Sequence, residues 1–272
     1  MNLRFNRFAK ALGSVIAPVI AITLAAGAAG CDGKIKVNGE EGKPLSELDL
    51  SGKAPEELVV AGPDEVRVTT GDKLAITVEG DAEAREQIRF SLKDNGLAIH
   101  RADKTFDSAT KGAIINVTMP APRELVMAGS GKITVPQLAP TAEVTIAGSG
   151  TVESAAIAGE SLDLTIAGSG NFRAAGNVKK LDMTIAGSGS AQMDALKVER
   201  ADVSIAGSGS SAFSSDGEVE ANIMGSGNVT VKGRARCSVS SMGSGKLICE
   251  TPVQQKDGPP ESPEAPEAPK AP

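Results

Sequence analysis

The second half of the chain alternates apolar and polar residues around a repeated Gly-Ser-Gly triplet. Relative to the first glycine of each triplet, apolar residues predominate two and four positions before it and four and six positions after it. Alternation with a period of two is typical of strands that bury one face. The triplets begin at Gly129, Gly148, Gly168, Gly187, Gly207, Gly225 and Gly243, at intervals of 18 to 20 residues. This period predicts a solenoid in which each repeat stacks on the one before.

Each repeat is predicted to contain a strand, a Gly-Ser-Gly corner and a second strand. Ile157, Val178 and Leu196 indicate a third short side in the longer repeats. Glycine suits the corner because it reaches positive φ without a Cβ penalty, and because corners stacked about 4.8 Å apart would crowd a larger side chain. We expect the serines from Ser130 to Ser244 to form a column linked by hydroxyl hydrogen bonds.

Residues 45–123 contain strand-like runs without the strict repeat. The runs are Glu57–Val60, Val66–Thr69, Leu74–Glu79, Ile88–Leu92, Leu97–His100 and Ile114–Met119. Turns separate them, at Gly62-Pro63 for example, and Ala82–Gln87 fits a short helical turn. These strands are expected to cap one end of the solenoid. At the other end, the prolines after Glu250 should stop strand pairing because proline lacks the backbone donor.

The fold class predicted is therefore all-β: a short parallel β-solenoid of about seven rungs with an N-terminal β capping region. Right-handed winding follows from the handedness rule for parallel crossovers. No Trp or Tyr is present in the chain, so the core must consist of Ile, Val, Leu, Met and Ala with few Phe. Small, repeated core residues suit a narrow solenoid better than a wide sandwich.

The N-terminus has the features of an export signal. Arg4, Arg7 and Lys10 precede an apolar run that ends in small residues, which predicts a signal peptide over residues 1–30. The sequence LAAGAAGC ending at Cys31 resembles the bacterial lipoprotein signal, in which this cysteine is lipidated. Ordinary secretion and a retained membrane helix are the alternatives. Lipidation would hold the protein in the cell envelope, facing the periplasm, at the inner or the outer membrane.

The remaining regions follow from composition. Residues 31–44 are polar and Gly-rich and are predicted to form a tether, residues 45–250 the solenoid domain, and residues 251–272 a disordered Pro-rich tail. The whole chain carries a net charge of −6, from 28 Lys and Arg against 34 Asp and Glu. Removal of residues 1–30 takes away three basic residues and gives −9. An acidic protein of this kind argues against nucleic-acid binding, and membrane contact would come from the lipid on Cys31.

The repeated IAGSG followed by an alternating strand resembles the bacterial head GIN domain family, a domain of unknown function suggested to form the head of auto-transporter adhesins. REQIRFSLKDNGLAIHR (85–101) and IINVTMPAPRELVMAGSG (114–131) are similar to the N-terminal strands of that family, so the resemblance spans roughly residues 50–250. It implies a β-helix-like solenoid in secreted or lipid-anchored proteins, with no established catalytic residues. Family members often place Asp or Asn after the triplet; here only Asn171 and Asn228 do so.

Carboxylates recur five residues before the triplets. They are Glu124, Glu143, Asp163, Asp182, Asp202 and Glu220, with Ser238 in the last repeat. In register, they would form a ladder whose like charges raise one another's pKa. We expect a solvated row of charges that discourages edge aggregation. The alternative is a column of cations such as Ca²⁺, which binds several oxygens.

Catalytic chemistry finds little support in the sequence. A nucleophilic serine needs a base and an orienting group, and the single histidine, His100, lies outside the repeat, where we expect an outward or satisfied strand residue. Gly-Ser-Gly lacks the Gly-Lys-Ser/Thr ending of a phosphate loop. Paired carboxylates leave a polysaccharide-acting β-helix enzyme as an alternative, but the aromatic platforms of sugar clefts are missing. We therefore expect no enzyme, no cofactor and no catalytic residue.

Cys237 and Cys249 lie six residues before and six after the first glycine of the last triplet, at inward positions. An exported compartment permits a disulfide between them. A bridge that clamps the last rung and a pair of buried thiols are both consistent with this spacing.

The function predicted is that of a non-catalytic, lipid-anchored envelope protein. Its outward Thr, Ser and Asn side chains would contact envelope polysaccharide or protein in adhesion or scaffolding, and a homo-oligomer is possible. A self-assembling or signalling module that docks through the Pro-rich tail is a further alternative.

Overall fold

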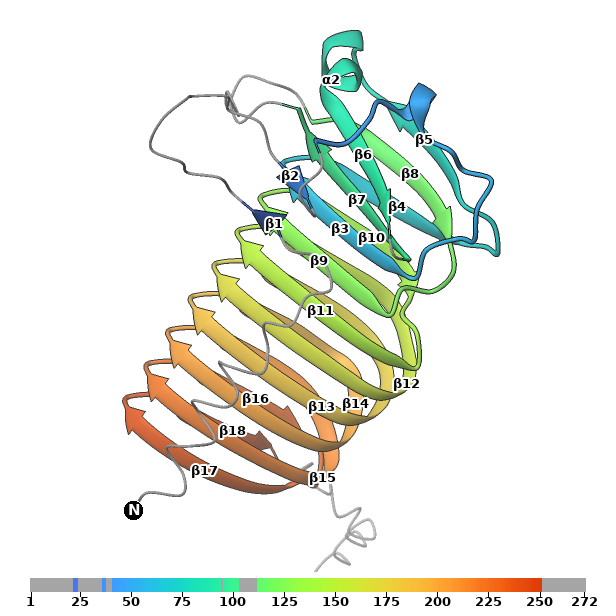
Figure 1. The fold of residues 1–272 in the computed structure, drawn as a ribbon. Helices are drawn as coiled ribbons and strands as arrows, with labels where there is room; N and C mark the ends of the chain where they lie inside the picture. Colours follow the sequence, from blue (N-terminus) through green and yellow to red (C-terminus); the bar gives the residue numbers. More distant parts are fainter. Residues whose placement is uncertain (1–21, 24–35, 38–40, 94, 103–111, 251–272) are drawn as a thin grey trace, which may run out of the picture.

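Parallel strands stacked in register form an elongated solenoid below a cap of N-terminal strands (Figure 1). The computed structural model describes residues 22–23, 36–37, 41–93, 95–102 and 112–250. Sixteen strands join into one sheet that winds into the solenoid. A separate two-stranded antiparallel pair joins β1 (Ile22–Thr23) to β2 (Lys36–Val37). The all-β parallel solenoid predicted from the period is confirmed.

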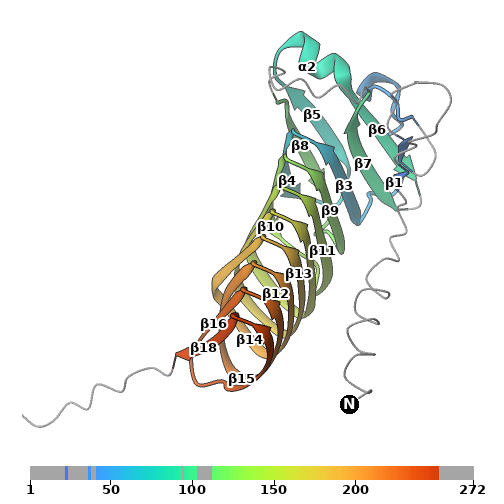
Figure 2. The ribbon, with the colours of Figure 1, turned by 90° about the vertical axis from the view of Figure 1, so that its left-hand side faces the viewer.

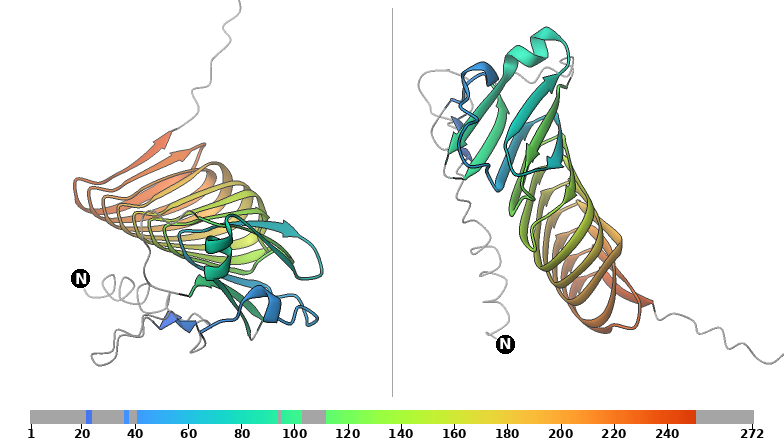
Figure 3. Two further views of the ribbon diagram at one scale, coloured as in Figure 1. Left: turned by 90° about the horizontal axis from the view of Figure 1, so that it is seen from above. Right: turned by 90° about the vertical axis from the view of Figure 1, so that its right-hand side faces the viewer.

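The repeat region begins with three short strands, continues with four long ones and ends with three short ones. The strands are β9 (Glu124–Gly129), β10 (Lys132–Gln137), β11 (Thr141–Gly148), β12 (Thr151–Gly168), β13 (Asn171–Gly187), β14 (Ser190–Gly207), β15 (Ser210–Gly225), β16 (Asn228–Lys232), β17 (Arg236–Gly243) and β18 (Lys246–Glu250). Strands β12 to β15 each run from one triplet to the next and curve around the side of the solenoid (Figure 3). The third side is therefore part of a continuous strand, marked only by irregular register such as that between Ser154 and Ile157.

Two faces meet at the Gly-Ser-Gly corners. We call the strands that end at a corner the leading face; it comprises 57–62, 124–129, 141–148, 161–168, 180–187, 200–207, 218–225 and 236–243. The strands that follow a corner form the trailing face, which begins each time one residue after the triplet. Along both faces, each residue pairs with the residue at the same place in the next rung. The corner thus sets a common register for the whole stack.

The core is a set of apolar columns inside the solenoid. Ile146, Ile166, Ile185 and Ile205 are almost completely buried and lie in adjacent rungs on the leading face. Phe172 and Phe213 are fully buried on the trailing face. Ile157, Val178 and Leu196 are buried as expected. At roughly 25 cal/mol per Å² of apolar surface removed from water, these columns are the main source of stability.

The corner uses its two glycines for different reasons. Gly168 has φ +119°, and a Cβ there would lie 2.6 Å from the carbonyl oxygen of Gly148. Gly170 is crowded instead by the core, because its Cβ would lie 2.4 Å from Ile146 Cγ2. The corners are joined by backbone hydrogen bonds: the amide of Ser149 donates to the Gly129 oxygen at 2.9 Å.

The serine hydroxyls do not form the expected ladder. The triplet serines are all exposed, and within the described residues no hydroxyl-to-hydroxyl bond joins one to the next. The backbone amides already link consecutive rungs, so the side chains are left facing water.

The N-terminal part contributes a rung that the sequence pattern did not reveal. Strands β3 (Glu57–Gly62) and β4 (Glu65–Thr70) pair in parallel with β9 and β10, and Gly62 lies opposite Gly129. Gly62-Pro63-Asp64 is therefore an eighth corner rather than a turn between irregular strands. The substitution of Asp64 for the last glycine hides it from a search for triplets.

Antiparallel strands close this end of the solenoid, as expected. Strand β7 (Gly96–Arg101) pairs in parallel with β3, and β6 (Ile88–Lys93) pairs antiparallel with β7. On the trailing face, β8 (Ile114–Met119) pairs with β4, and β5 (Ala75–Glu79) pairs antiparallel with β8. Helix α2 (Ala82–Gln87) links β5 to β6 at the outer end (Figure 2) and confirms the predicted helical turn. A 3-10 turn, η1 (Leu45–Glu47), precedes β3.

A buried ion pair connects this cap to the first corner. Asp64 accepts hydrogen bonds from Arg101 Nε at 2.9 Å and from the Ala113 amide at 2.8 Å. The side chains of Asp64 and Arg101 are only 4% and 5% exposed. Three segments that lie far apart in sequence are thus tied together by one carboxylate.

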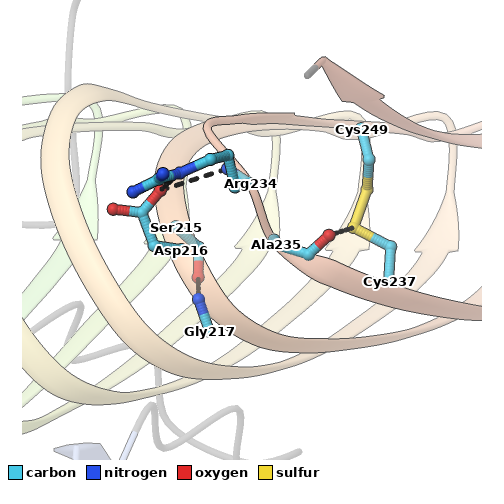
Figure 4. Close-up of a disulfide and its surroundings, with 7 residues drawn as sticks. All are labelled: Ser215, Asp216, Gly217, Arg234, Ala235, Cys237 and Cys249. Atoms are coloured by element: carbon cyan, nitrogen blue, oxygen red, sulfur yellow. Dashed lines mark hydrogen bonds and ion pairs between the residues drawn. A yellow bond between two sulfur atoms is a disulfide. The ribbon is translucent and has the colours of Figure 1, made fainter. Parts of the chain in front are cut away.

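The last rung carries a disulfide between Cys237 of β17 and Cys249 of β18, with Cα atoms 6.7 Å apart (Figure 4). Most of the predicted signal peptide, the predicted lipidation site Cys31, most of the tether and the tail at 251–272 lie outside the described residues. Among the residues that are described, no helix has the length and apolar character needed to cross a membrane.

Candidate binding face

The outward side chains of the leading face form four parallel columns, and the fourth, seven residues before each corner, contains Thr141, Ser161, Lys180, Arg200, Glu218 and Arg236. The first, one residue before each corner, is Ala128, Ala147, Ala167, Ala186, Ala206, Met224 and Met242. The second, three residues before, is Val126, Thr145, Thr165, Thr184, Ser204, Asn222 and Ser240. The third, five residues before, is the row of carboxylates. Because parallel strands lie about 4.8 Å apart, each column repeats at that spacing.

The second column, which we call the hydroxyl column, is accessible because the side chains on one side of it are small. Thr145, Thr165 and Thr184 lie opposite one another in successive rungs and are each half-buried. Small alanines on one side leave their hydroxyl groups accessible. Both flanking strands hold each threonine at the backbone, so the hydroxyl spacing is fixed by the fold. The result is a row of hydrogen-bonding groups whose backbone is already fixed before a partner binds.

The structure aligns the six predicted carboxylates and adds a seventh. Glu57 of β3 lies opposite Glu124 of β9 and extends the row into the rung that the sequence pattern missed. Glu124 faces a like charge on both sides. Burial, together with the charges of Glu57 and Glu143, raises the pKa of Glu124 to about 7. The signal that could have found Glu57 is its place five residues before Gly62.

Desolvation shifts other members of the row in the same direction. Burial first, and then Asp163, raise the pKa of Glu143. Burial followed by the charge of Asp182 raises the pKa of Asp163, and the same two causes, with Glu220, raise that of Asp202. The pKa values of these four carboxyls, Glu124, Glu143, Asp163 and Asp202, are therefore raised first by burial and then by the like charges that the sequence predicted.

Two basic residues, Lys180 and Arg200, lie beside the middle of the row. Lys180 Nζ lies 2.6 Å from Asp182. Its charge also opposes the upward pKa shifts of Asp163 and Asp202. The charge of Arg200 also opposes the upward pKa shift of Asp202, and the two cations neutralise only part of the ladder.

Charges elsewhere on the solenoid are paired between rungs. On the trailing face, Glu153 bonds Lys132 at 2.7 Å and Arg173 at 3.0 Å. Around the third side, three ion pairs also join adjacent or next-nearest rungs: Lys179–Glu160, Lys197–Asp216 and Lys232–Asp194. The leading face also has such ion pairs, since Glu218 contacts Arg200 and Arg236. What distinguishes this face is its row of carboxylates, a run of one sign of charge, beside a run of hydroxyls.

Metal binding and catalysis gain no geometric support. In the part of the chain that the structure describes, no group of three or more His, Cys, Asp and Glu side chains is arranged to hold a metal ion. His100 lies on β7, far along the fold from most of the corner serines. It is buried, its Nδ1 lies 3.0 Å from the Arg101 carbonyl oxygen, and Nε2 has no hydrogen-bond partner. Burial lowers its pKa. Of the two positions expected for this strand residue, outward or satisfied, the outward one is wrong because His100 is buried, and the hydrogen-bonded one holds for Nδ1.

The sequence matches one protein family. The family model described as "Putative auto-transporter adhesin, head GIN domain" matches residues 54–235. No curated protein resembles the chain closely enough to match. A crystal structure titled a "putative adhesin" from Bacteroides fragilis has 18% identity and a TM-score of 0.65, covering 73% of this chain and 93% of the other.

Two further crystal structures share the fold. A "putative lipid binding protein" from Parabacteroides distasonis has 22% identity and a TM-score of 0.58, covering 73% of this chain and 94% of that one. A "putative adhesin" from Parabacteroides merdae has 17% identity and a TM-score of 0.51, covering 73% and 92%. At these identities the likeness is one of fold.

Proposed function

Because the chain belongs to the head GIN domain family of auto-transporter adhesin heads, we propose that it is a non-catalytic adhesion or scaffolding protein whose leading face binds its partner. The observation that carries this proposal is the in-register column of Thr, Ser and Asn at positions 145, 165, 184, 204 and 222. A rigid array of identical groups favours a partner that is itself repetitive. Envelope polysaccharide and a repetitive surface protein both fit.

Binding at this face would be multivalent. One hydroxyl contact is weak, since a hydrogen bond exchanged with water contributes only about 1 kcal/mol net. Successive rungs held at one spacing make each further contact an intramolecular event, which raises avidity without new chemistry. The row of carboxylates beside the hydroxyls disfavours anionic polymers and favours neutral or basic ones.

We propose further that the protein is exported and lipid-anchored through Cys31, with the solenoid facing the periplasm or the cell exterior. The support is the sequence LAAGAAGC after a basic and apolar segment. Labelling with palmitate should mark the wild-type chain and leave Cys31→Ala unmarked, and fractionation should move Cys31→Ala out of the membrane pellet. A wild-type chain that takes up no label would exclude the anchor.

The binding proposal is tested by placing positive charge on the leading face. Retention of the full chain on beads coated with bacterial cell-wall sacculi or extracted envelope polysaccharide is measured for Thr165→Lys/Thr184→Lys. We expect retention to fall about tenfold or more, because two adjacent contacts are lost from a multivalent site.

The matched control is Asn171→Lys/Ser190→Lys. These residues lie opposite each other on the trailing face, are similarly half-buried, and add the same two charges. The control should bind as the wild type does. Equal losses in the two variants would show that net charge matters and the leading face does not, and would overturn the proposal.

A further inference from the structure

The two ends of the solenoid are finished differently. At the N-terminal end, the last strands β5 and β6 pair antiparallel with their neighbours, α2 links them, and Phe90 of β6 forms an isolated bridge with Lys43. At the C-terminal end, β17 and β18 are edge strands, and nothing among the described residues pairs with their outer sides. An open edge of this kind is a template for pairing with another chain.

Apolar side chains gather at this open end. Val239 and Ile248 are 50% and 45% exposed, although their counterparts in inner rungs are buried or half-buried. The column of small alanines on the leading face also changes here, to Met224 and Met242, which are 41% and 68% exposed. These four are the exposed large hydrophobic side chains of the described residues. Their concentration at one end indicates a surface that is covered by a partner.

The edge is complementary in charge to itself. Strand β18 begins at Lys246 and ends at Glu250, with Ile248 at its centre. If a second β18 runs antiparallel about Ile248, Lys246 lies opposite Glu250 of the partner subunit. Leu247 then lies opposite the inward-facing Cys249 of the partner subunit, so the apolar interior continues across the junction. Opposite charges on directly facing residues stabilise such a pair.

We propose that the C-terminal end of the solenoid is a dimer interface, at which a second copy of this chain stacks end to end by antiparallel pairing of β18. This goes beyond the proposed adhesive function, because it involves neither the hydroxyl column nor any external ligand. Because the same end of both copies is used in this two-fold interface, the assembly closes at two copies instead of growing into a fibre.

The chain's own tail is a poorer occupant for this edge. Residues 254–272 contain no Leu, Ile, Val, Phe or Met and many prolines. Proline cannot donate to a ladder, and a segment without large apolar side chains would not cover Met242 and Ile248. The second copy supplies both the backbone donors and the apolar groups.

Disulfide trapping tests the interface in membranes that contain the full chain. In Ile248→Cys, the two introduced thiols face each other across the two-fold axis, and we expect a dimer on non-reducing gels. The matched control is Thr230→Cys, which lies in the same outward column one rung inward. It should stay monomeric. If Ile248→Cys forms no more dimer than Thr230→Cys, the proposal fails.

Charge reversal provides a second test that does not depend on cysteine chemistry. By light scattering of the detergent-solubilised chain, the wild type should have the mass of two copies, and Lys246→Glu and Glu250→Lys should each reduce the dimer at least tenfold. The double variant Lys246→Glu/Glu250→Lys should restore it. A wild type that stays monomeric at tens of micromolar, or that dimerises only after truncation behind Glu250, would overturn the proposal; the latter result would assign the end to the tail.

Discussion

At the scale of single residues, the corner is a backbone device whose two glycines are constrained by different neighbours. Gly168 is fixed by its positive φ and by the carbonyl of the rung before it, whereas Gly170 is fixed by a core isoleucine. The serine between them is exposed and has no structural partner that the fold requires. In each triplet, the fold therefore requires the two glycines, whereas the serine between them can be replaced by other residues.

We expect Gly168→Ala to destabilise the protein by about 2–5 kcal/mol, because the new Cβ adds both a strained φ and an overlap with the Gly148 oxygen. Ser169→Ala in the same corner should change the free energy of unfolding by less than about 0.5 kcal/mol. Urea denaturation followed by circular dichroism measures both. A loss at Ser169 as large as that at Gly168 would mean that the column of triplet serines is structural after all.

The carboxylate row should make stability depend on pH. Since the pKa of Glu124 is about 7 in the folded protein and 4.5 without these neighbours, the folded state binds this proton more tightly than the unfolded state does. Its contribution is complete below about pH 4.5 and is lost as the pH rises through about 7. The melting temperature should therefore be higher at pH 5 than at pH 8.

Glu124→Gln isolates this effect. At pH 8 the variant should be more stable than the wild type by on the order of 1–2 kcal/mol, since a tenfold change in proton affinity corresponds to about 1.4 kcal/mol and screening reduces the effect at a partly exposed site. At pH 4.5 the two should unfold alike. A benefit of equal size at both pH values would rule out charge relief as the cause.

At the scale of elements, the first corner differs from the others in being tied to the cap. Asp64 stands in place of the last glycine, and its carboxylate joins β7 to the start of β8 through Arg101 and Ala113. The polar link replaces the tight glycine packing of the other corners. It also orients the antiparallel strands that cover the stack.

Asp64→Asn should destabilise the protein by about 3–5 kcal/mol, because it removes one partner of a buried charge pair. The neighbouring Glu65 pairs with Arg67 on the surface at 2.8 Å, and Glu65→Gln should cost less than about 1 kcal/mol. Thermal unfolding of both variants measures these two changes in stability. Similar, small losses of stability in the two variants would show that the fold does not need the buried pair.

Most elements were predictable because local pattern and long-range packing agree. Alternation around the triplets located the strands of the repeat and their inward columns, and six further runs matched β3 to β8 within a few residues. The corner at Gly62 was missed because Pro63 and Asp64 replace the residues that define the triplet. Glu57 was missed with it, and the Asp64–Arg101 pair spans 37 residues that no local pattern connects.

At the scale of the whole molecule, backbone pairing joins each rung only to its neighbours, and few side-chain contacts such as Lys232–Asp194 reach further. Stability is therefore close to a sum over rungs and interfaces. The last rung is the weakest by this measure, because one of its sides lacks a neighbour among the described residues and its β17 residues are exposed. The disulfide between Cys237 and Cys249 holds β17 to β18 where packing alone is thin (Figure 4).

Reduction of the oxidised chain should add two hydrogens to its mass, and a chain that gains none would lack the bridge. In Cys237→Ser/Cys249→Ser, we expect hydrogen-exchange protection to fall in residues 236–250 while β12 and β13 keep theirs. A disulfide that closes a loop of about this length stabilises the folded state by about 3 kcal/mol, by constraining the unfolded chain. In a repeat protein, the loss of stability in one rung is transmitted mainly to the rungs next to it. Uniform loss of protection along the solenoid would show that it unfolds as a single unit.

Because the corners share a common register, the number of repeats sets the length of the solenoid. Duplication or loss of one whole repeat, for instance residues 149–168, brings the next corner to the same place and changes the reach of the molecule by about 4.8 Å. The cap and the last rung would be untouched. A genetic event that removes half a repeat instead displaces every later corner. Evolution can therefore lengthen or shorten this protein in discrete steps, by gain or loss of whole repeats between the shared IAGSG segments, without redesigning either end.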